Sequence, residues 1–159
     1  MWRRFTSSSV HKVDQKGRVS VPSLYRKALE ALDAGGVVVL VPSLMDPGAI
    51  EGYAPSGFDA VAAKIARMHP SSPQRRVLEW RFIGEAQPSE LDANGRIVLP
   101  PAFKAAAGIA GEAKFVGAGD KFQIWAPAAH EAALGALEAE TPAAEAMAAL
   151  PWGDAEGAP

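Results

Sequence analysis

"HKVDQKGRVSVP" (residues 11–22) and "SELDANGRIVLP" (residues 89–100) share one skeleton of Asp, Gly, Arg, alternating aliphatic residues and Pro. Aligning Asp14 with Asp92 gives an offset of 78 residues, and the similarity continues beyond the two stretches. Residues of the same kind pair at this offset: Val13/Leu91, Gly17/Gly95, Arg18/Arg96, Val19/Ile97, Val21/Leu99, Pro22/Pro100, Tyr25/Phe103, Arg26/Lys104 and Ala28/Ala106. Such internal similarity predicts that the chain builds one structural unit twice.

A second match lies further along each half, where "YAP" (53–55) corresponds to "WAP" (125–127) at an offset of 72 residues. The smaller offset means that the first half holds about six extra residues between the two matched blocks. The segment "PSLMDPGAIEG" (42–52) is the expected place for them, because its Pro and Gly residues are typical of a longer loop.

Each half is predicted to form the same series: a short strand, the D-x-x-G-R turn, a strand ended by Pro, a helix, two strands and a closing helix. The alternation of Val19 and Val21, or of Ile97 and Leu99, places aliphatic side chains on one face of the strand after the turn. Helices are expected at residues 22–32, 56–68, 101–109 and 128–140, and the further strands at residues 36–41, 49–54 and 113–126, the last with a hairpin turn at "GAGD". The series predicts an α+β fold that is mainly β, with short flanking helices.

The same pattern suggests a division of the chain. Residues 1–70 are expected to form the first repeat, residues 71–81 a connecting segment and residues 82–140 the second repeat. "QRRVLEWRF", which leads into the second repeat, is expected to form a short helix or strand. The acidic, Ala-, Pro- and Gly-rich residues 141–159 are expected to form a flexible tail.

Composition excludes several functions. The 159 residues are 48% hydrophobic, which is enough for a core, and the absence of Cys excludes disulfides and thiol catalysis. The three histidines His11, His69 and His130 are isolated from one another, so no metal site and no cofactor are expected. No apolar run of membrane-spanning length and no secretory signal appears, so a cytoplasmic protein is expected, without a membrane partner.

Charge is distributed unevenly along the chain, although the net charge is only −2. Residues 1–30 carry seven basic and two acidic side chains, a balance of +5. Residues 128–159 carry six acidic and no basic side chains, a balance of −6. A basic beginning and an acidic end indicate different roles for the two ends.

The D-x-x-G-R turn explains two of its own residues by local structure. Asp14 and Asp92 can accept hydrogen bonds from backbone N–H groups further along the turn, and Gly17 and Gly95 tolerate the left-handed conformation that closes it. These four residues are therefore assigned to turn shape. The arginine that follows each Gly either pairs with its own Asp or projects outward as a guanidinium fork, and the sequence leaves both open.

The first turn lies in the basic part of the chain. Lys12, Lys16 and Arg18 are expected to gather there with Arg3 and Arg4 nearby, in excess of what one Asp can neutralise. Such a cluster favours an anion, and a guanidinium fork suits phosphate oxygens or the N7/O6 edge of guanine. A plain solvated face is the alternative.

The second turn is less basic, because Glu90 stands where Lys12 stands and Asn94 where Lys16 stands. A nucleic-acid contact there is expected to depend on Arg96, with Asn94 as a neutral donor and acceptor. Enzyme motifs such as G-x-S-x-G, Walker A and H-E-x-x-H are absent from the sequence. Since the aspartates of the two turns have structural roles, no catalytic residue and no small-molecule substrate are expected.

The two D-x-x-G-R turns, each followed by alternating aliphatics, Pro and a short amphipathic helix, resemble the MraZ family over about residues 1–140. The halves of that family are related to the double-psi or swapped-hairpin AbrB-like β-barrel. The resemblance implies that two internal repeats complete this barrel as a pseudo-dimer. It further implies a bacterial transcription regulator that binds direct promoter repeats of its own division and cell-wall gene cluster, forms a homo-oligomeric ring and accompanies the nucleoid.

Transferred to matching positions, the resemblance implies that Arg18 and Arg96 contact double-stranded DNA. Lys16 matches the family's K-G-R, whereas Asn94 replaces it in the second copy. The other expected DNA-binding residues are Lys12, Arg3 and Arg4, the arginines as phosphate contacts. The alternative function is a ring-forming scaffold or assembly protein without sequence-specific DNA binding.

Overall fold

A computed structural model of the protein describes residues 2–153. Its elements, in chain order, are β1 (Ser8–Lys12), β2 (Arg18–Ser20), α1 (Ser23–Asp33), β3 (Val37–Pro42), β4 (Ile50–Tyr53), α2 (Pro55–Ala66), α3 (Pro73–Leu78), the π-helix η1 (Glu79–Ile83), β5 (Gln87–Glu90), β6 (Arg96–Val98), α4 (Pro101–Ala106), β7 (Glu112–Gly117), β8 (Phe122–Trp125), α5 (Pro127–Glu140) and α6 (Ala143–Ala148). Contacts divide the chain into two compact units, residues 1–127 and residues 128–159.

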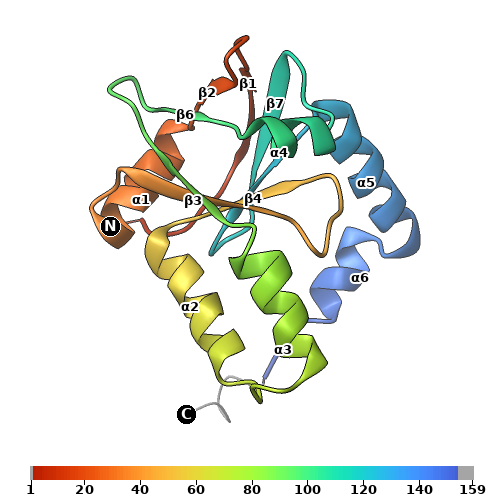
Figure 1. Ribbon diagram of the computed structural model, residues 1–159. Coiled ribbons are helices and arrows are strands. Elements are labelled where there is room, and N and C mark those ends of the chain that lie inside the picture. The colour runs from red at the N-terminus through yellow and green to blue at the C-terminus, as the bar shows by residue number, and fades with distance from the viewer. Residues whose placement is uncertain (1, 154–159) are drawn as a thin grey trace. The chain divides into compact units, whose positions relative to one another are not determined.

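The strands form a six-stranded antiparallel sheet, in the order β1-β7-β8-β4-β3-β5, and a separate two-stranded ribbon of β2 and β6. Four of the six ladders join a strand of the first half to a strand of the second: β1 to β7, β3 to β5, β4 to β8 and β2 to β6. Only the hairpins β3–β4 and β7–β8 stay within one half. Each half therefore lends its first strand to the other half, as a swapped-hairpin fold requires (Figure 1).

The predicted α+β class is confirmed, and the expected closed barrel requires a correction. Within the described residues the sheet is open, with β1 at one edge and β5 at the other. Each edge strand runs into a D-x-x-G-R turn that leads to the ribbon, so the strands after the turns pair with each other instead of closing the sheet. The expected loop at 42–52 is also shorter, because β3 reaches Pro42 and β4 begins at Ile50.

The main core contains aromatic side chains from both halves. Phe5, Tyr25, Phe115 and Phe122 are each at most 1% exposed. The ring centroid of Phe122 lies 5.1 Å from the ring centroid of Phe5, 4.9 Å from that of Tyr25 and 5.9 Å from that of Phe115. Gly52 of β4 makes room for this cluster, since a Cβ there would lie 2.4 Å from the Phe122 ring. The two halves thus share one core rather than forming one each.

A smaller apolar cluster lies where α2, α3 and η1 meet β3 and β4. Phe58 of α2 stacks on Phe82 of η1 at 5.2 Å, and Tyr53 packs edge-on against Phe82 at 5.7 Å. Pro at the first turn starts both α2 and α3, where its missing N–H costs no hydrogen bond. The two helices lie side by side (Figure 1). Residues 73–83, which begin within the expected connecting segment 71–81, are therefore helical.

The second unit, residues 128–159, contains α6 and nearly all of α5. Within residues 141–159, which are expected to form a flexible tail, Ala143–Ala148 form a helix that Pro142 precedes. The last six residues of that expected tail, 154–159, lie outside the described part of the chain. No helix among residues 2–153 is long and apolar enough to cross a membrane.

Candidate nucleic-acid interface

The first turn is held by its own aspartate. Asp14 Oδ1 accepts hydrogen bonds from the backbone N–H groups of Lys16 at 2.9 Å and Arg18 at 2.8 Å. The Nε of Arg18 donates to Asp14 Oδ2 at 2.6 Å, and Gly17 N–H donates to the Asp14 carbonyl at 3.0 Å. One carboxylate therefore fixes both the backbone of the turn and the side chain of its arginine.

The second turn repeats these bonds one by one. Asp92 Oδ1 accepts from the N–H groups of Asn94 at 2.8 Å and Arg96 at 3.0 Å, and Asp92 Oδ2 accepts from Arg96 Nε at 3.2 Å. Gly95 N–H donates to the Asp92 carbonyl at 3.0 Å. The turn-shaping roles predicted for Asp92 and Gly95 agree with these contacts.

Each turn glycine also joins its turn to the other half. Gly17 and Gly95 have φ values of 81° and 73°, in the left-handed region where Gly is favoured. The Gly17 carbonyl accepts from Leu99 N–H at 2.8 Å, and the Gly95 carbonyl accepts from Val21 N–H at 3.0 Å. These bonds extend the β2–β6 ribbon at both ends, so the two turns are parts of one rigid element.

Gly17→Ala is expected to lower the free energy of unfolding by about 1–2 kcal/mol, because an L side chain is strained at this φ. The added Cβ would also lie 3.1 Å from the Leu99 carbonyl oxygen that follows the ribbon. Urea unfolding measures the change. Gly111→Ala is the control, because Gly111 has open space around it, and equal stability of both variants and the parent would contradict the expected strain.

The pairing with Asp leaves hydrogen-bond donors of both arginines available. A guanidinium has five N–H donors, and the Nε bond to Asp occupies one, so the two terminal nitrogens with four N–H groups remain. The side chains of Arg18 and Arg96 are 37% and 31% exposed. The local Asp–Arg pair is therefore present in both turns, and each arginine side chain stays partly exposed beside its aspartate.

The ribbon places both arginines on one face. In the antiparallel register Arg18 lies opposite Val98 and Ser20 opposite Arg96, while Val19 pairs with Ile97. Val19 and Ile97 are buried, so the other four residues share the outward face. Arg18 and Arg96 are diagonal neighbours there, with backbones about 7–8 Å apart. The two arginines therefore lie on one small surface, an arrangement that suits neighbouring anions.

Hydrogen bonds within the turns favour the charged form of both carboxylates. The backbone N–H of Arg18 lowers the pKa of Asp14, with further help from the Arg18 guanidinium and Lys16 N–H. The pKa of Asp92 is lowered in the same way, first by the N–H of Arg96. Because each pKa is lowered on folding, the stabilisation is complete above the ordinary value of 3.8 and is lost as pH falls through the lowered pKa. The turns keep their shape at neutral pH.

Of the other predicted DNA-binding residues, Lys16 and Asn94 lie exposed within their turns, and Lys12 lies exposed at the end of β1 next to the first turn. Arg3 and Arg4 are not near this turn, contrary to expectation. Phe5 pairs with Gly119 in the β7–β8 loop, so the two arginines lie at the far end of β1. The five residues of β1 separate them from the turn by roughly 17 Å.

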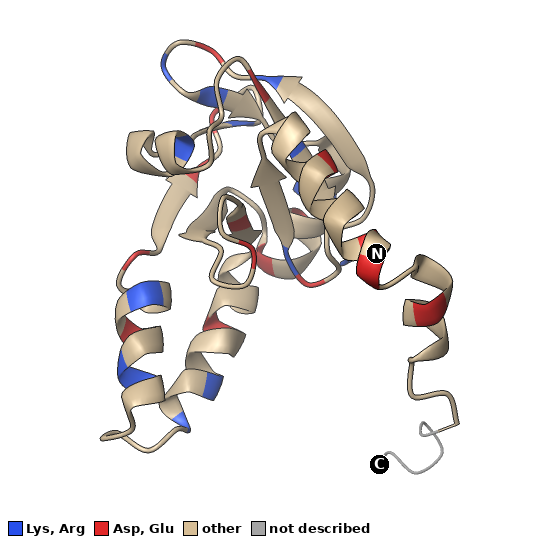
Figure 2. Ribbon diagram, turned by 90° about the vertical axis from the view of Figure 1, so that its right-hand side faces the viewer, with Lys and Arg blue, Asp and Glu red and all other residues tan. Residues whose placement is uncertain are grey.

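Cationic side chains also occur where sequence reasoning did not place them. Besides the loops at the top of Figure 2, Lys and Arg lie on the helix pair α2 and α3 at its bottom. Arg26 of α1 matters most, because it lies directly over Gly95 of the second turn. The repeat alignment paired Arg26 with Lys104 but carried no signal for this position.

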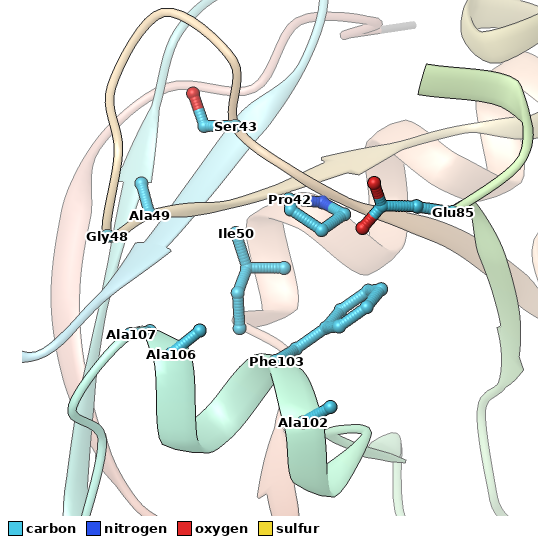
Figure 3. A pocket seen from close by; sticks show the side chains of 10 residues that line it. All are labelled: Pro42, Ser43, Gly48, Ala49, Ile50, Glu85, Ala102, Phe103, Ala106 and Ala107. Atoms are coloured by element: carbon cyan, nitrogen blue, oxygen red, sulfur yellow. The ribbon is translucent and has the colours of Figure 1, made fainter. Parts of the chain in front are cut away.

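The surface carries several hollows, among them one of about 460 Å³ along α3. A pocket of about 210 Å³ lies between α4 and the β3–β4 loop, with Ile50 and Phe103 facing each other across it and Glu85 at its rim (Figure 3). This volume is below the roughly 300–1,000 Å³ of small-molecule sites. Among residues 2–153 no group of three or more His, Asp or Glu side chains is placed to hold a metal ion.

Interleaved halves that present two matching D-x-x-G-R turns on one ribbon define a swapped-hairpin repeat protein. A family model described as "MraZ protein, putative antitoxin-like" matches residues 82–150. Relatives named transcriptional regulator MraZ match most of the chain. The one from Ruegeria pomeroyi is 41% identical over 137 residues, 82% of each chain.

A second such relative, from Parvibaculum lavamentivorans, is 37% identical over 128 residues, 80% of this chain and 79% of its own. A third, from Stenotrophomonas maltophilia, is 34% identical over 130 residues, 82% of this chain and 87% of its own. The chain belongs to the MraZ family, as the repeated turns had indicated.

Proposed function

We propose that this protein is a DNA-binding transcriptional regulator that contacts DNA through its two D-x-x-G-R turns. One observation carries the proposal: the ribbon presents Arg18 and Arg96 on a single outward face, each oriented by an aspartate. Phosphate oxygens and guanine edges are the nucleic-acid groups that such forks bind in two-pronged fashion. The names of the relatives support a role in transcription.

The finer form of the proposal has four parts. The DNA is a set of direct repeats in the promoter of the protein's own division and cell-wall gene cluster, and the protein works in the cytoplasm on the nucleoid. Lys12 and Lys16 add phosphate contacts to the first turn. The protein assembles as a homo-oligomeric ring, so that several modest contacts act together on repeated sites through their effective concentration. Such multivalency reconciles DNA binding with a net charge of −2.

The second candidate is a ring-forming scaffold without sequence-specific binding. Fluorescence anisotropy with a duplex from the region upstream of the protein's own gene, and with a shuffled duplex of equal composition, separates the two. We expect tighter binding to the upstream duplex. We also expect affinity to fall between about 50 mM and about 200 mM salt, because the release of counterions from phosphates favours binding less as the salt concentration rises. Equal affinity for both duplexes would favour the scaffold.

A further inference from the structure

The second turn carries less positive charge than the first turn, and the residues of its own half at the corresponding positions do not make up the difference. The first turn region carries Lys12, Lys16 and Arg18 against Asp14, a balance of +2. The corresponding positions of the second, Glu90, Asp92, Asn94 and Arg96, have a balance of −1. A turn of net negative charge repels phosphates, so a contact through Arg96 needs another cation close by.

Arg26 of α1 supplies that cation from the first half. A Cβ placed at Gly95 would lie 2.9 Å from both Cδ and Nη1 of Arg26, so the guanidinium covers the turn glycine. Arg26 also borders a hollow of about 240 Å³, whose lining includes the acidic residues Glu30 and Asp92. Including Arg26, the charge balance of the second turn rises from −1 to zero.

Two hydrogen bonds fix this position. Arg26 Nε donates to the Val21 carbonyl at 3.1 Å, and Val21 N–H donates to the Gly95 carbonyl at 3.0 Å. Val21 thus ties the arginine of one half to the turn of the other. No carboxylate among residues 2–153 forms an ion pair with Arg26, in contrast to Arg18 and Arg96. The terminal nitrogens of Arg26 are therefore not held in an ion pair with a carboxylate of the described residues.

The first turn has no equivalent. Atoms nearest to a Cβ at Gly17 belong to Leu99 and Val98, and no cation is among them. Lys104, which corresponds to Arg26 at the offset of 78, makes no side-chain hydrogen bond in the described part of the chain. Lysine also lacks the Nε–H that holds Arg26. The extra cation is thus specific to the turn that needs it.

We propose that Arg26 is a DNA-contacting residue of the second turn, where its guanidinium binds a backbone phosphate beside the site of Arg96. This inference rests on the proposed DNA-binding function. The role fits Gly95, since any side chain at this position would displace the Arg26 guanidinium as well as strain the turn.

The test measures the affinity of Arg26→Ala for the upstream duplex by fluorescence anisotropy. The control is Lys27→Ala, which removes one positive charge from an exposed position of the same helix. We expect Arg26→Ala to weaken binding about tenfold and to reduce the salt slope by about 0.9, the value for one phosphate contact. Lys27→Ala is expected to bind like the parent. If Arg26→Ala unfolds at a lower temperature than the parent, Arg26→Gln, which keeps most of the aliphatic stem, is used in its place. We expect Arg26→Gln to show the same loss of DNA affinity.

Double variants assign the contact to one turn. Gly95, which Arg26 covers, lies opposite Val21, and Arg18 lies three steps along the ribbon from Val21, about 10 Å, so the losses from Arg26→Ala and Arg18→Ala should add. The double variant Arg26→Ala/Arg96→Ala should lose less binding free energy than the sum of the two single variants. In the double variant Arg26→Ala/Arg18→Ala, the two losses of binding free energy should add. Arg26→Ala that binds like the parent while Arg96→Ala is weakened overturns this inference alone. A parent protein that binds no duplex overturns the proposed function together with it.

Discussion

Arg18→Ala and Arg96→Ala are each expected to weaken binding to the upstream duplex by about 1–3 kcal/mol, between roughly fivefold and more than a hundredfold. Each arginine offers the two terminal nitrogens of its fork, because only Nε is engaged by the turn aspartate. Anisotropy titrations of the single variants measure the loss. The aspartate that remains adds to it, since removal of its arginine leaves a negative charge facing phosphates.

The matched controls are Arg18→Lys and Arg96→Lys, which keep the charge and remove the fork. If the guanidinium geometry matters, both Lys variants lose most of the preference for the upstream over the shuffled duplex while they retain much of the salt-dependent affinity. Recovery of full preference by the Lys variants would contradict a fork-specific contact. Thermal unfolding of each variant confirms that the turns still fold.

Phe122→Ala is expected to lower the free energy of unfolding by about 3–5 kcal/mol, the largest effect on stability that we foresee. Phe122 is fully buried and touches Phe5 and Tyr25 of the first half as well as Phe115 of the second. Its removal therefore leaves a cavity in the core that both halves share. Urea unfolding, followed by circular dichroism, measures the loss.

Phe58→Ala provides a control of identical chemistry in the smaller cluster. Phe58 is only partly buried and stacks on Phe82 of η1, away from the shared core. We expect a smaller loss there, with a single cooperative unfolding transition for both variants. A larger loss for Phe58→Ala than for Phe122→Ala would show that the shared core is not the main source of stability.

The turns were predictable because their structure is local. Asp14 and Gly17 lie three residues apart, and the hydrogen bonds that they make follow from the residue types and the spacing. The repeat at 78 residues also indicated the shared plan of the two halves. The burial of Val19 and Ile97 follows from the alternation of each strand, whereas the pairing of the two strands with each other does not.

The contacts that could not be predicted from the sequence depend on the exchange of strands between the two halves. Arg26 belongs to the first half and lies over Gly95 of the second, a contact between residues 69 positions apart that no local pattern encodes. Arg3 and Arg4 were expected near the first turn because they are close in sequence. Because β1 is extended, residues that are close to the turn in sequence lie far from it in space. The pairing of Phe5 with Gly119 places Arg3 and Arg4 at the end of β1 that is remote from the turn.

The most direct test of the DNA-binding turns is the affinity of the Arg18→Ala/Arg96→Ala double variant for the upstream duplex, measured beside its oligomeric state by light scattering. We expect the double variant to keep the fold and the assembly of the parent and to lose its preference for the upstream over the shuffled duplex. A folded double variant that binds the upstream duplex with the affinity and preference of the parent would contradict the account.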